Sequence, residues 1–146
     1  MDREILFRGK RIDTGKWVEG SLISFGKNMK AILLSKTKAY RPKDTEFFCS
    51  INCCDVIPET VGQYTGIYDK NGRRIFEGDI VTIPNSKKQG LPAVIKWSQS
   101  ETRFEISRMG YQPLPLDPLF SRNGYYSRCE IVGNIHDNPE LLEGGE

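Results

Sequence analysis

Short runs of apolar residues, separated by segments rich in Gly, Asn, Asp and Lys, follow one another along this chain of 146 residues. Two of the runs share one pattern, because residues 17–23 and 75–81 each have two apolar residues, Glu, Gly, a small polar residue and two aliphatic residues. Glycine within a β-prone run is typical of a tight bend or a bulge. The pattern therefore predicts two turn-and-strand units of one design, with Gly20 and Gly78 at equivalent bends.

The other apolar runs also favour strands. They are short and bounded by turn residues, and the 14 Gly and 8 Pro of the chain argue against long helices. Asn71-Gly72 predicts a tight turn, because both residue types tolerate a positive φ. Three prolines between residues 109 and 123 predict a surface loop there. Further strands are expected at residues 5–7, 29–34, 61–68, 91–98, 102–108 and 125–132.

These elements predict a mainly β fold of short antiparallel strands in a single domain, residues 1–146. Small sets of strands reduce their exposed edges by closing into a barrel. We therefore expect an SH3-like barrel over residues 56–142, with residues 1–50 as an additional N-terminal β layer.

Two local signals add to this picture. Asn138 in the N-cap position, followed by Pro139 in the first turn, predicts a short C-terminal helix. The two tryptophans of the chain, Trp17 and Trp97, are expected to fill the core rather than to line a binding site.

The net charge of +2 is unevenly distributed. Residues 1–50 carry 11 basic and 6 acidic side chains, and residues 51–146 carry 10 basic and 13 acidic ones. Residues 27–43 contain six basic residues and no acidic one. Basic side chains beside an aromatic ring are typical of sites that hold phosphates and stack a base, whereas the alternative is an ordinary solvated face. The candidate nucleic-acid-binding residues are Lys36, Lys38, Tyr40, Arg41 and Lys43.

The four cysteines are interpreted as reduced thiols without a metal. Cys49, Cys53 and Cys54 are close in sequence, but their spacing is not Cys-x-x-Cys. Adjacent cysteines on a strand point to opposite sides of it. A four-ligand zinc site would need Cys129 or His136 to approach from far along the chain. We therefore expect no metal and no cofactor.

Carboxylates are the best candidates for chemistry in this sequence. If the two repeats faced one another, Glu19 and Glu77 would form a paired-acid or hard-cation site together with Asp79. The alternative, which we favour, is that acidic residues beside Gly bends accept backbone hydrogen bonds and fix the turn. His136 is the single histidine and belongs to no recognisable catalytic triad, and the sequence has no phosphate-binding loop. The residue chemistry therefore does not indicate an enzyme.

Several motifs resemble one known family when they are taken together and in order along the chain. The chain is similar to the YopX family of small bacteriophage and prophage proteins. The resemblance implies a phage or prophage gene product with a mostly β fold, and it brings no catalytic residues with it. The motifs lie at residues 7–10, 17–20, 60–66, 69–72, 75–81 and 132–142.

Together these observations predict a non-enzymatic accessory protein that acts by binding. The expected partner is a host or phage protein, or a second copy of the chain in a homo-oligomer that forms through strand edges and loops. The alternative partner is a nucleic acid bound by the basic segment 27–43. The first residues lack the apolar run of a signal peptide, and no segment approaches the roughly 20 apolar residues of a membrane span. A bacterial cytoplasmic location is therefore expected, with no membrane partner.

Overall fold

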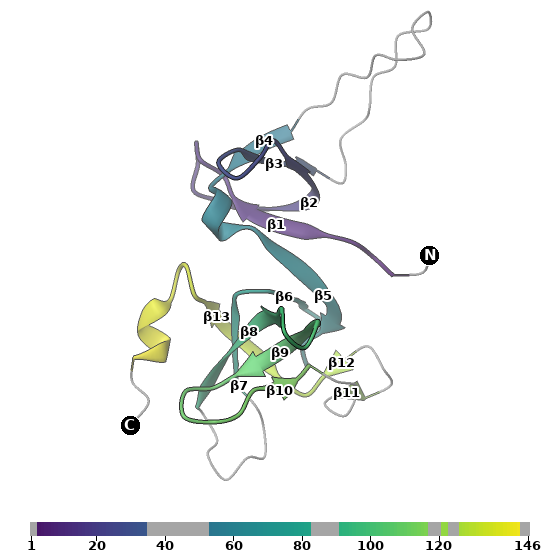
Figure 1. Cartoon of the computed structure of the whole chain (residues 1–146), viewed down its shortest axis with the longest axis vertical. Helices are drawn as coiled ribbons and strands as arrows, with labels where there is room; N and C mark the ends of the chain where they lie inside the picture. The colour runs from purple at the N-terminus through teal and green to yellow at the C-terminus, as the bar shows by residue number, and fades with distance from the viewer. Residues whose placement is uncertain (1–2, 35–52, 83–90, 117–120, 123–125, 144–146) are drawn as a thin grey trace, which may run out of the picture. The chain divides into compact units, whose positions relative to one another are not determined.

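The structure is a computed structural model, and it describes residues 3–34, 53–82, 91–116, 121–122 and 126–143. The chain forms two compact units, Glu4–Gln63 and Tyr64–Glu146, which we call the N-terminal unit and the C-terminal unit. Strand β5 (Gly62–Tyr68) carries the chain from the first unit into the second (Figure 1). The units therefore divide at residue 63, later than the end of the expected N-terminal layer at residue 50.

The N-terminal unit is an antiparallel meander. Its strands are β1 (Phe7–Lys10), β2 (Trp17–Ser24), β3 (Lys30–Leu34) and β4 (Cys53–Val56), and each pairs with the next. The start of β5 pairs with β1 on its other side. The prediction of short antiparallel strands in this part of the chain is confirmed.

The meander turns back on itself at one corner. Arg11 forms an isolated bridge with Val56, and the amide of Ile57 donates to the carbonyl of Lys10 at 2.8 Å. The 3-10 helix η1 (Pro58–Thr60) follows directly. The hydroxyl of Thr60 accepts a hydrogen bond from the amide of Lys10 and donates one to the carbonyl of Ile57. These bonds fix the end of β4 beside the end of β1.

Glycines allow the close packing of this small unit. A Cβ on Gly20 would lie 1.8 Å from the carbonyl oxygen of Leu33, and a Cβ on Gly9 would lie 2.9 Å from the side chain of Val56. Val56 and Ile32 are almost fully buried. The apolar side of the meander therefore packs closely only because two of its residues lack side chains.

The C-terminal unit contains a five-stranded antiparallel sheet in the order β10-β9-β8-β7-β13. Its core contains Ile75, Val81, Ala93, Ile95, Ile106, Cys129 and Ile131. A second group of short strands, β6, β11 and β12, extends from β5. The strands of the unit after β5 are β6 (Arg74–Phe76), β7 (Asp79–Thr82), β8 (Pro92–Ser98), β9 (Arg103–Ser107), β10 (Leu114–Pro115), β11 (Ser121–Arg122), β12 (Tyr126–Ser127) and β13 (Glu130–Asn134).

The mainly β fold is therefore confirmed, but the SH3-like barrel expected over residues 56–142 is not. In the described part of this unit no pairing joins the outer strands β10 and β13, so the sheet does not close into a barrel. The hairpin expected between residues 91–98 and 102–108 is present as β8 and β9, paired from Val94 with Ser107 to Ser98 with Arg103.

The predicted equivalence of the two repeats is wrong. Gly20 lies within the continuous strand β2, opposite Leu34. Gly78 instead has φ +89° in the turn between β6 and β7, so the second copy is two strands rather than one. Gly20 is needed for a close backbone approach and Gly78 for a left-handed conformation, so the same residue type meets two different requirements.

The C-terminal helix is a 3-10 helix, η3 (Pro139–Leu142), with Pro139 in its first turn as predicted. The predicted capping bond is absent, because the side chain of Asn138 instead accepts a hydrogen bond from the amide of Asn134. Among the described residues, no helix is both long and apolar enough to cross a membrane.

Candidate functional site

The basic segment predicted from the sequence is described only in part. Lys36, Lys38, Tyr40, Arg41 and Lys43 lie outside the described residues, while Lys27 and Lys30 are in the β2–β3 hairpin. The described residues of the N-terminal unit carry six basic and five acidic side chains. The four basic residues among the candidates therefore lie outside the described residues, and the described part of this unit is almost neutral.

The β2–β3 hairpin places exposed apolar and basic groups at its tip. Phe25 and Met29 are exposed, and the amide of Phe25 donates to the carbonyl of Met29 at 2.9 Å. Gly26 has φ +95° in the turn. The ammonium group of Lys30 donates to the carbonyl of Gly26 at 2.8 Å and to the hydroxyl of Ser24. The charge of Lys30 therefore helps to hold the turn, while Lys27 is exposed.

The three candidate carboxylates are in different surroundings. Asp79 is buried and accepts a hydrogen bond from the amide of Phe76 at 2.7 Å, which is the turn-fixing role favoured above. Glu77 is half-buried in the same turn, and Glu19 is exposed on β2 in the other unit. Within the described ranges, no three residues among His, Cys, Asp and Glu are grouped so that they could hold a metal ion.

The cysteines that the structure describes are free thiols. Cys53 is exposed and Cys54 is half-buried, as expected for neighbours on the two sides of β4, and Cys129 is fully buried in the core of the C-terminal unit. Cys49 lies outside the described residues.

One outer edge of the five-stranded sheet is covered by Asp69. This fully buried carboxylate accepts hydrogen bonds from the amides of Asn71 and Arg73 through Oδ1, at 2.9 Å each. Its Oδ2 accepts one from the amide of Ile131 in β13 at 3.2 Å. The next amide, that of Lys70, donates to the carbonyl of Cys129 at 2.9 Å. The first half of β13 therefore has its outer hydrogen-bonding groups already occupied.

Asn138 covers the other half of β13. Its amide donates to the carbonyl of Asn134 at 2.9 Å, and its side-chain oxygen accepts from the amide of Asn134 at 3.3 Å. A Cβ on Gly133 would lie only 2.6 Å from that oxygen, so a glycine is required there. The opposite edge strand, β10, is two residues long and contains Pro115, which has no amide to donate. Both edges of this sheet are therefore poorly suited to adding another strand.

An apolar surface lies on β8, β9 and β10 instead. Trp97 is opposite Phe104, and the amide of Leu116 donates to the carbonyl of Phe104 at 2.9 Å. The rings of Trp97 and Phe104 meet edge to face with centroids 5.1 Å apart. We call Trp97, Phe104, Leu114 and Leu116 the apolar surface.

This surface is on the same face of the sheet as the core residues, but it extends past the part of that face that is buried. Alternate residues of a strand share a face, so Trp97 is on the same side as Ile95, which is fully buried. Trp97 is nevertheless 43% exposed and Leu114 is 46% exposed. The expectation that Trp97 fills the core is therefore wrong. The alternation of apolar residues correctly placed Trp97 on the core face of the sheet. It does not show how far along the β8–β9 hairpin that face is covered by other parts of the protein.

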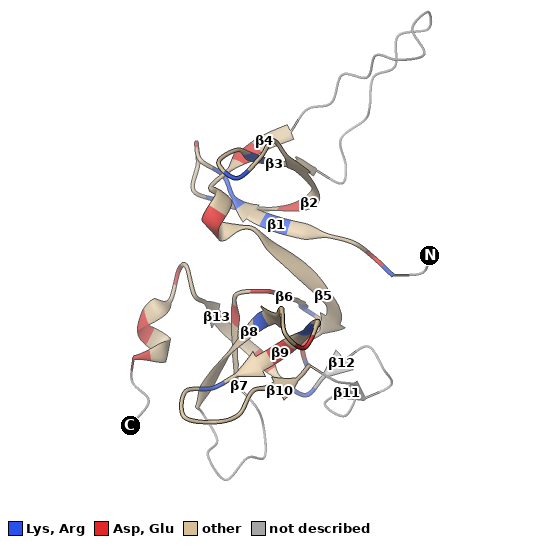
Figure 2. Cartoon of the chain, viewed as in Figure 1, with Lys and Arg blue, Asp and Glu red and all other residues tan. Residues whose placement is uncertain are grey.

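A different cluster lies on the N-terminal unit. Arg8 and Lys10 alternate along β1 and flank Trp17 of β2, with the Arg8 guanidinium carbon 4.8 Å and the Lys10 nitrogen 5.9 Å from a ring centroid of the indole. Lys10 is opposite Trp17 in the register, and Arg8 is opposite Glu19. We call Arg8, Lys10 and Trp17 the cation–indole cluster; β1 carries blue bands in Figure 2.

In this cluster, the repulsion between two cations and their attraction to the indole are of similar size. The Cα atoms of alternate strand residues are about 7 Å apart, and two positive charges at that distance would repel by about 0.6 kcal/mol in water and about four times that at an effective dielectric constant of 20. Each contact of a cation with an indole face contributes about 0.5–1 kcal/mol at an exposed site. The attraction of the two cations to the indole is therefore of the same order as the repulsion that they would feel at that distance.

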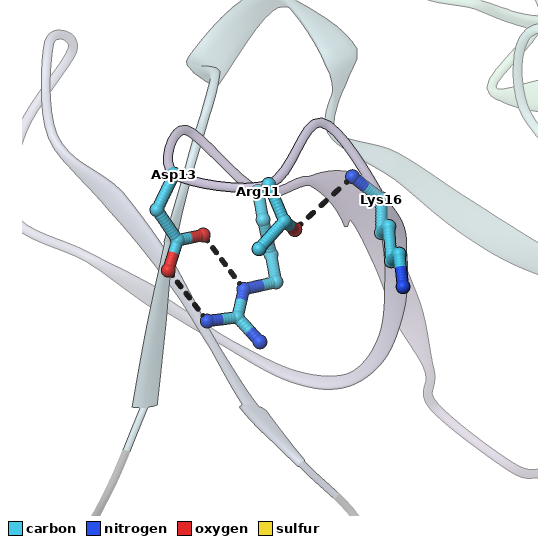
Figure 3. A network of polar contacts seen from close by, with 4 residues as sticks. Arg11, Asp13 and Lys16 are labelled. Carbon is cyan, nitrogen blue, oxygen red and sulfur yellow. Dashed lines mark hydrogen bonds and ion pairs between the residues drawn. The ribbon is translucent and has the colours of Figure 1, made fainter.

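Arg11, the next basic residue, has a local acidic partner (Figure 3). Its guanidinium donates to both carboxylate oxygens of Asp13, at 2.8 and 2.6 Å. Its amide donates to the carbonyl of Lys16 at 2.9 Å. The hydrogen bond from Arg11 lowers the pKa of the Asp13 carboxyl below its ordinary value of 3.8, and the same bond raises the pKa of Arg11. This pair shapes the β1–β2 turn and leaves little net charge there.

A second exposed ion pair joins Lys70 to Glu130, with 2.7 Å between the nitrogen and oxygen atoms. The hydrogen bond from Lys70 lowers the pKa of the Glu130 carboxyl below its ordinary value of 4.5. The pair lies at the same edge of β13 as the hydrogen bond from the amide of Ile131 to Asp69.

The structure defines a small β protein of two units, with an exposed apolar surface on one and a cation–indole cluster on the other. Residues 6–143 match the family described as YopX protein, and the chain belongs to the YopX family. The crystal structure of protein EF1440 from Enterococcus faecalis is similar to it, with 24% sequence identity, a TM-score of 0.63, and coverage of 97% of this chain and 99% of that chain. At this level of identity the likeness shows the shared fold. No curated protein matches the chain.

Proposed function

We propose that this protein is a non-enzymatic accessory protein that acts by binding another protein through the apolar surface of the C-terminal unit. The observation that carries the proposal is the exposure of Trp97, which packs against Phe104, on the same sheet face as the exposed Leu114. The phage or prophage origin that the family resemblance implies, and a bacterial cytoplasmic location, are parts of the same proposal.

The energetics suit a binding role for Trp97. The exposed 43% of this side chain corresponds to roughly 100 Å². Covering that area would contribute about 2.5 kcal/mol. Tryptophans in such positions are often the residues on which an interface depends most. A partner that contacts only side chains is also consistent with the two covered edges of the sheet, which disfavour association by strand addition.

The experiment compares the wild-type chain with the double variant Trp97→Ser/Leu114→Ser. Each tagged protein is used to capture partners from nuclease-treated bacterial lysate, and its self-association is measured by sedimentation equilibrium. We expect a protein partner, or a second copy of the chain, that the double variant binds at least about 30-fold more weakly, because about 2 kcal/mol of apolar contact is lost.

The matched control is Phe25→Ser/Met29→Ser, which removes two comparably exposed apolar side chains from the N-terminal unit. This control should bind as the wild type does. If the control and the Trp97 variant lose binding equally, or if neither loses it, the apolar surface is not the binding site.

The alternative function, nucleic-acid binding by residues 27–43, is supported within the described residues by Lys27 and Phe25, which are exposed together at the tip of the β2–β3 hairpin. The capture is therefore repeated with lysate that has not been treated with nuclease, and a partner that is captured only from this untreated lysate would favour the alternative over a protein partner.

A further inference from the structure

The cation–indole cluster is not explained by the proposed protein-binding function, because it lies in the N-terminal unit and the apolar surface lies in the C-terminal unit. It also lies outside the basic segment 27–43. Arg8 and Lys10 come from one strand, so the positions of their Cα atoms and the face that they share are fixed by the backbone of β1 and do not depend on a loop.

The strand register gives the neighbours of Arg8 on both sides. The residue opposite Arg8 on β2 is Glu19, which is exposed, and the residue opposite it on β5 is Gly62, which is buried. A ligand that approaches Arg8 from the β2 side therefore meets the carboxylate of Glu19.

We propose that the cation–indole cluster binds the phosphodiester backbone of a nucleic acid. Two cations at the spacing of alternate strand residues match the repeat of a phosphate chain, in which successive charges are also several ångströms apart. Both cations lie close to the indole of Trp17, which favours contacts with phosphates over stacking of bases on that ring. Binding through this cluster is therefore insensitive to base sequence.

The packing alternative is that the aliphatic stems of Arg8 and Lys10 simply cover the indole. Substitution by methionine distinguishes this packing role from phosphate binding, because methionine keeps an unbranched aliphatic stem and removes the charge. The test variant is therefore Arg8→Met/Lys10→Met. The matched control is Lys96→Met/Arg108→Met in the C-terminal unit, which removes the same charge, with Arg108 also 5.7 Å from an aromatic ring, that of Tyr111.

Binding is measured with an oligothymidylate of about 12 nucleotides, within the roughly 4–16 nucleotides that small single-strand sites cover, and with a duplex of the same length. The plot of log K against log salt should become shallower by about 1.4–1.8 in the test variant, because two phosphate contacts are lost. At about 50 mM salt its affinity should fall about tenfold or more. The control variant should keep the salt dependence of the wild type. Whichever of the two oligonucleotides binds more tightly identifies single-stranded or duplex nucleic acid as the ligand.

The variant Glu19→Gln is expected to change the affinity for nucleic acid in the opposite direction. Removal of the carboxylate opposite Arg8 should strengthen nucleic-acid binding by about threefold or more, whereas a purely structural cluster predicts no gain. The proposal is overturned if the wild type binds neither oligonucleotide at about 50 mM salt, or if the test and control variants lose affinity equally. Loss of nucleic-acid binding with an unchanged protein partner would leave the proposed function of the apolar surface intact, so the two failures are distinguishable.

Discussion

At the scale of single residues, the two glycines of the repeated phrase differ in what they require. Gly20 leaves no space for a Cβ, whereas a Cβ on Gly78 would have its nearest neighbour at 3.6 Å but would need φ +89°. The sequence predicted that both positions matter, because a glycine interrupts each run. It did not distinguish a close approach of two backbones from a left-handed turn, since glycine satisfies both requirements.

This difference gives a testable order of stabilities. Gly20→Ala should destabilise the protein by about 3 kcal/mol or more, because the backbone of β3 has to move. Gly78→Ala should cost about 1–2 kcal/mol and Gly78→Val about 1–3 kcal/mol, from backbone strain alone. Urea unfolding of the three variants measures this order, and a larger loss for Gly78→Ala than for Gly20→Ala would contradict it.

A second prediction concerns the Lys70–Glu130 pair. The pKa of Glu130 lies below its ordinary value of 4.5 in the folded protein because Lys70 donates a hydrogen bond to its carboxylate. The folded state therefore binds this proton more weakly than the unfolded state does, and the contribution of the pair is present above the unfolded pKa and lost as pH falls through the folded one. In an NMR titration the pKa of Glu130 should rise in Lys70→Met, and an unchanged pKa would show that the pair does not form.

At the scale of elements, alternation and turn residues were enough to predict most strands and the β8–β9 hairpin. The split of residues 74–82 into β6 and β7 was not predicted, because a glycine in a short apolar run is compatible both with a bend within one strand and with a turn between two strands. The covering of the β13 edge was also not predictable, since Asp69 is 62 residues from Ile131 and nothing local marks the contact.

The role of Asp69 as the cover of β13 can be tested directly. Asp69→Asn should destabilise the C-terminal unit by about 2–3 kcal/mol, because one oxygen cannot accept from three amides and the new NH2 group faces donors. In hydrogen exchange, the amide of Ile131 should lose protection more than amides of β8. Asn71→Asp, in the same turn but exposed, serves as the control and should cost much less.

At the scale of the whole molecule, each unit carries one candidate binding surface. We propose that the apolar surface of the C-terminal unit binds a protein and that the cation–indole cluster of the N-terminal unit binds a nucleic-acid backbone. Membership of the YopX family was predictable from ordered motifs at both ends of the chain. Neither surface was predictable, because Trp17 and Trp97 look alike in sequence and differ only in what surrounds them.

The chain's two tryptophans make the central claim directly measurable, since one lies in each surface. Trp97→Phe leaves Trp17 as the sole indole, and Trp17→Phe leaves Trp97. Each variant is titrated with the oligothymidylate at low salt while tryptophan emission is recorded, and salt is then added to reverse binding. We expect the emission of Trp17 to change and to recover with salt, while the emission of Trp97 stays constant. A response from Trp97 alone, or from neither indole, would contradict this expectation.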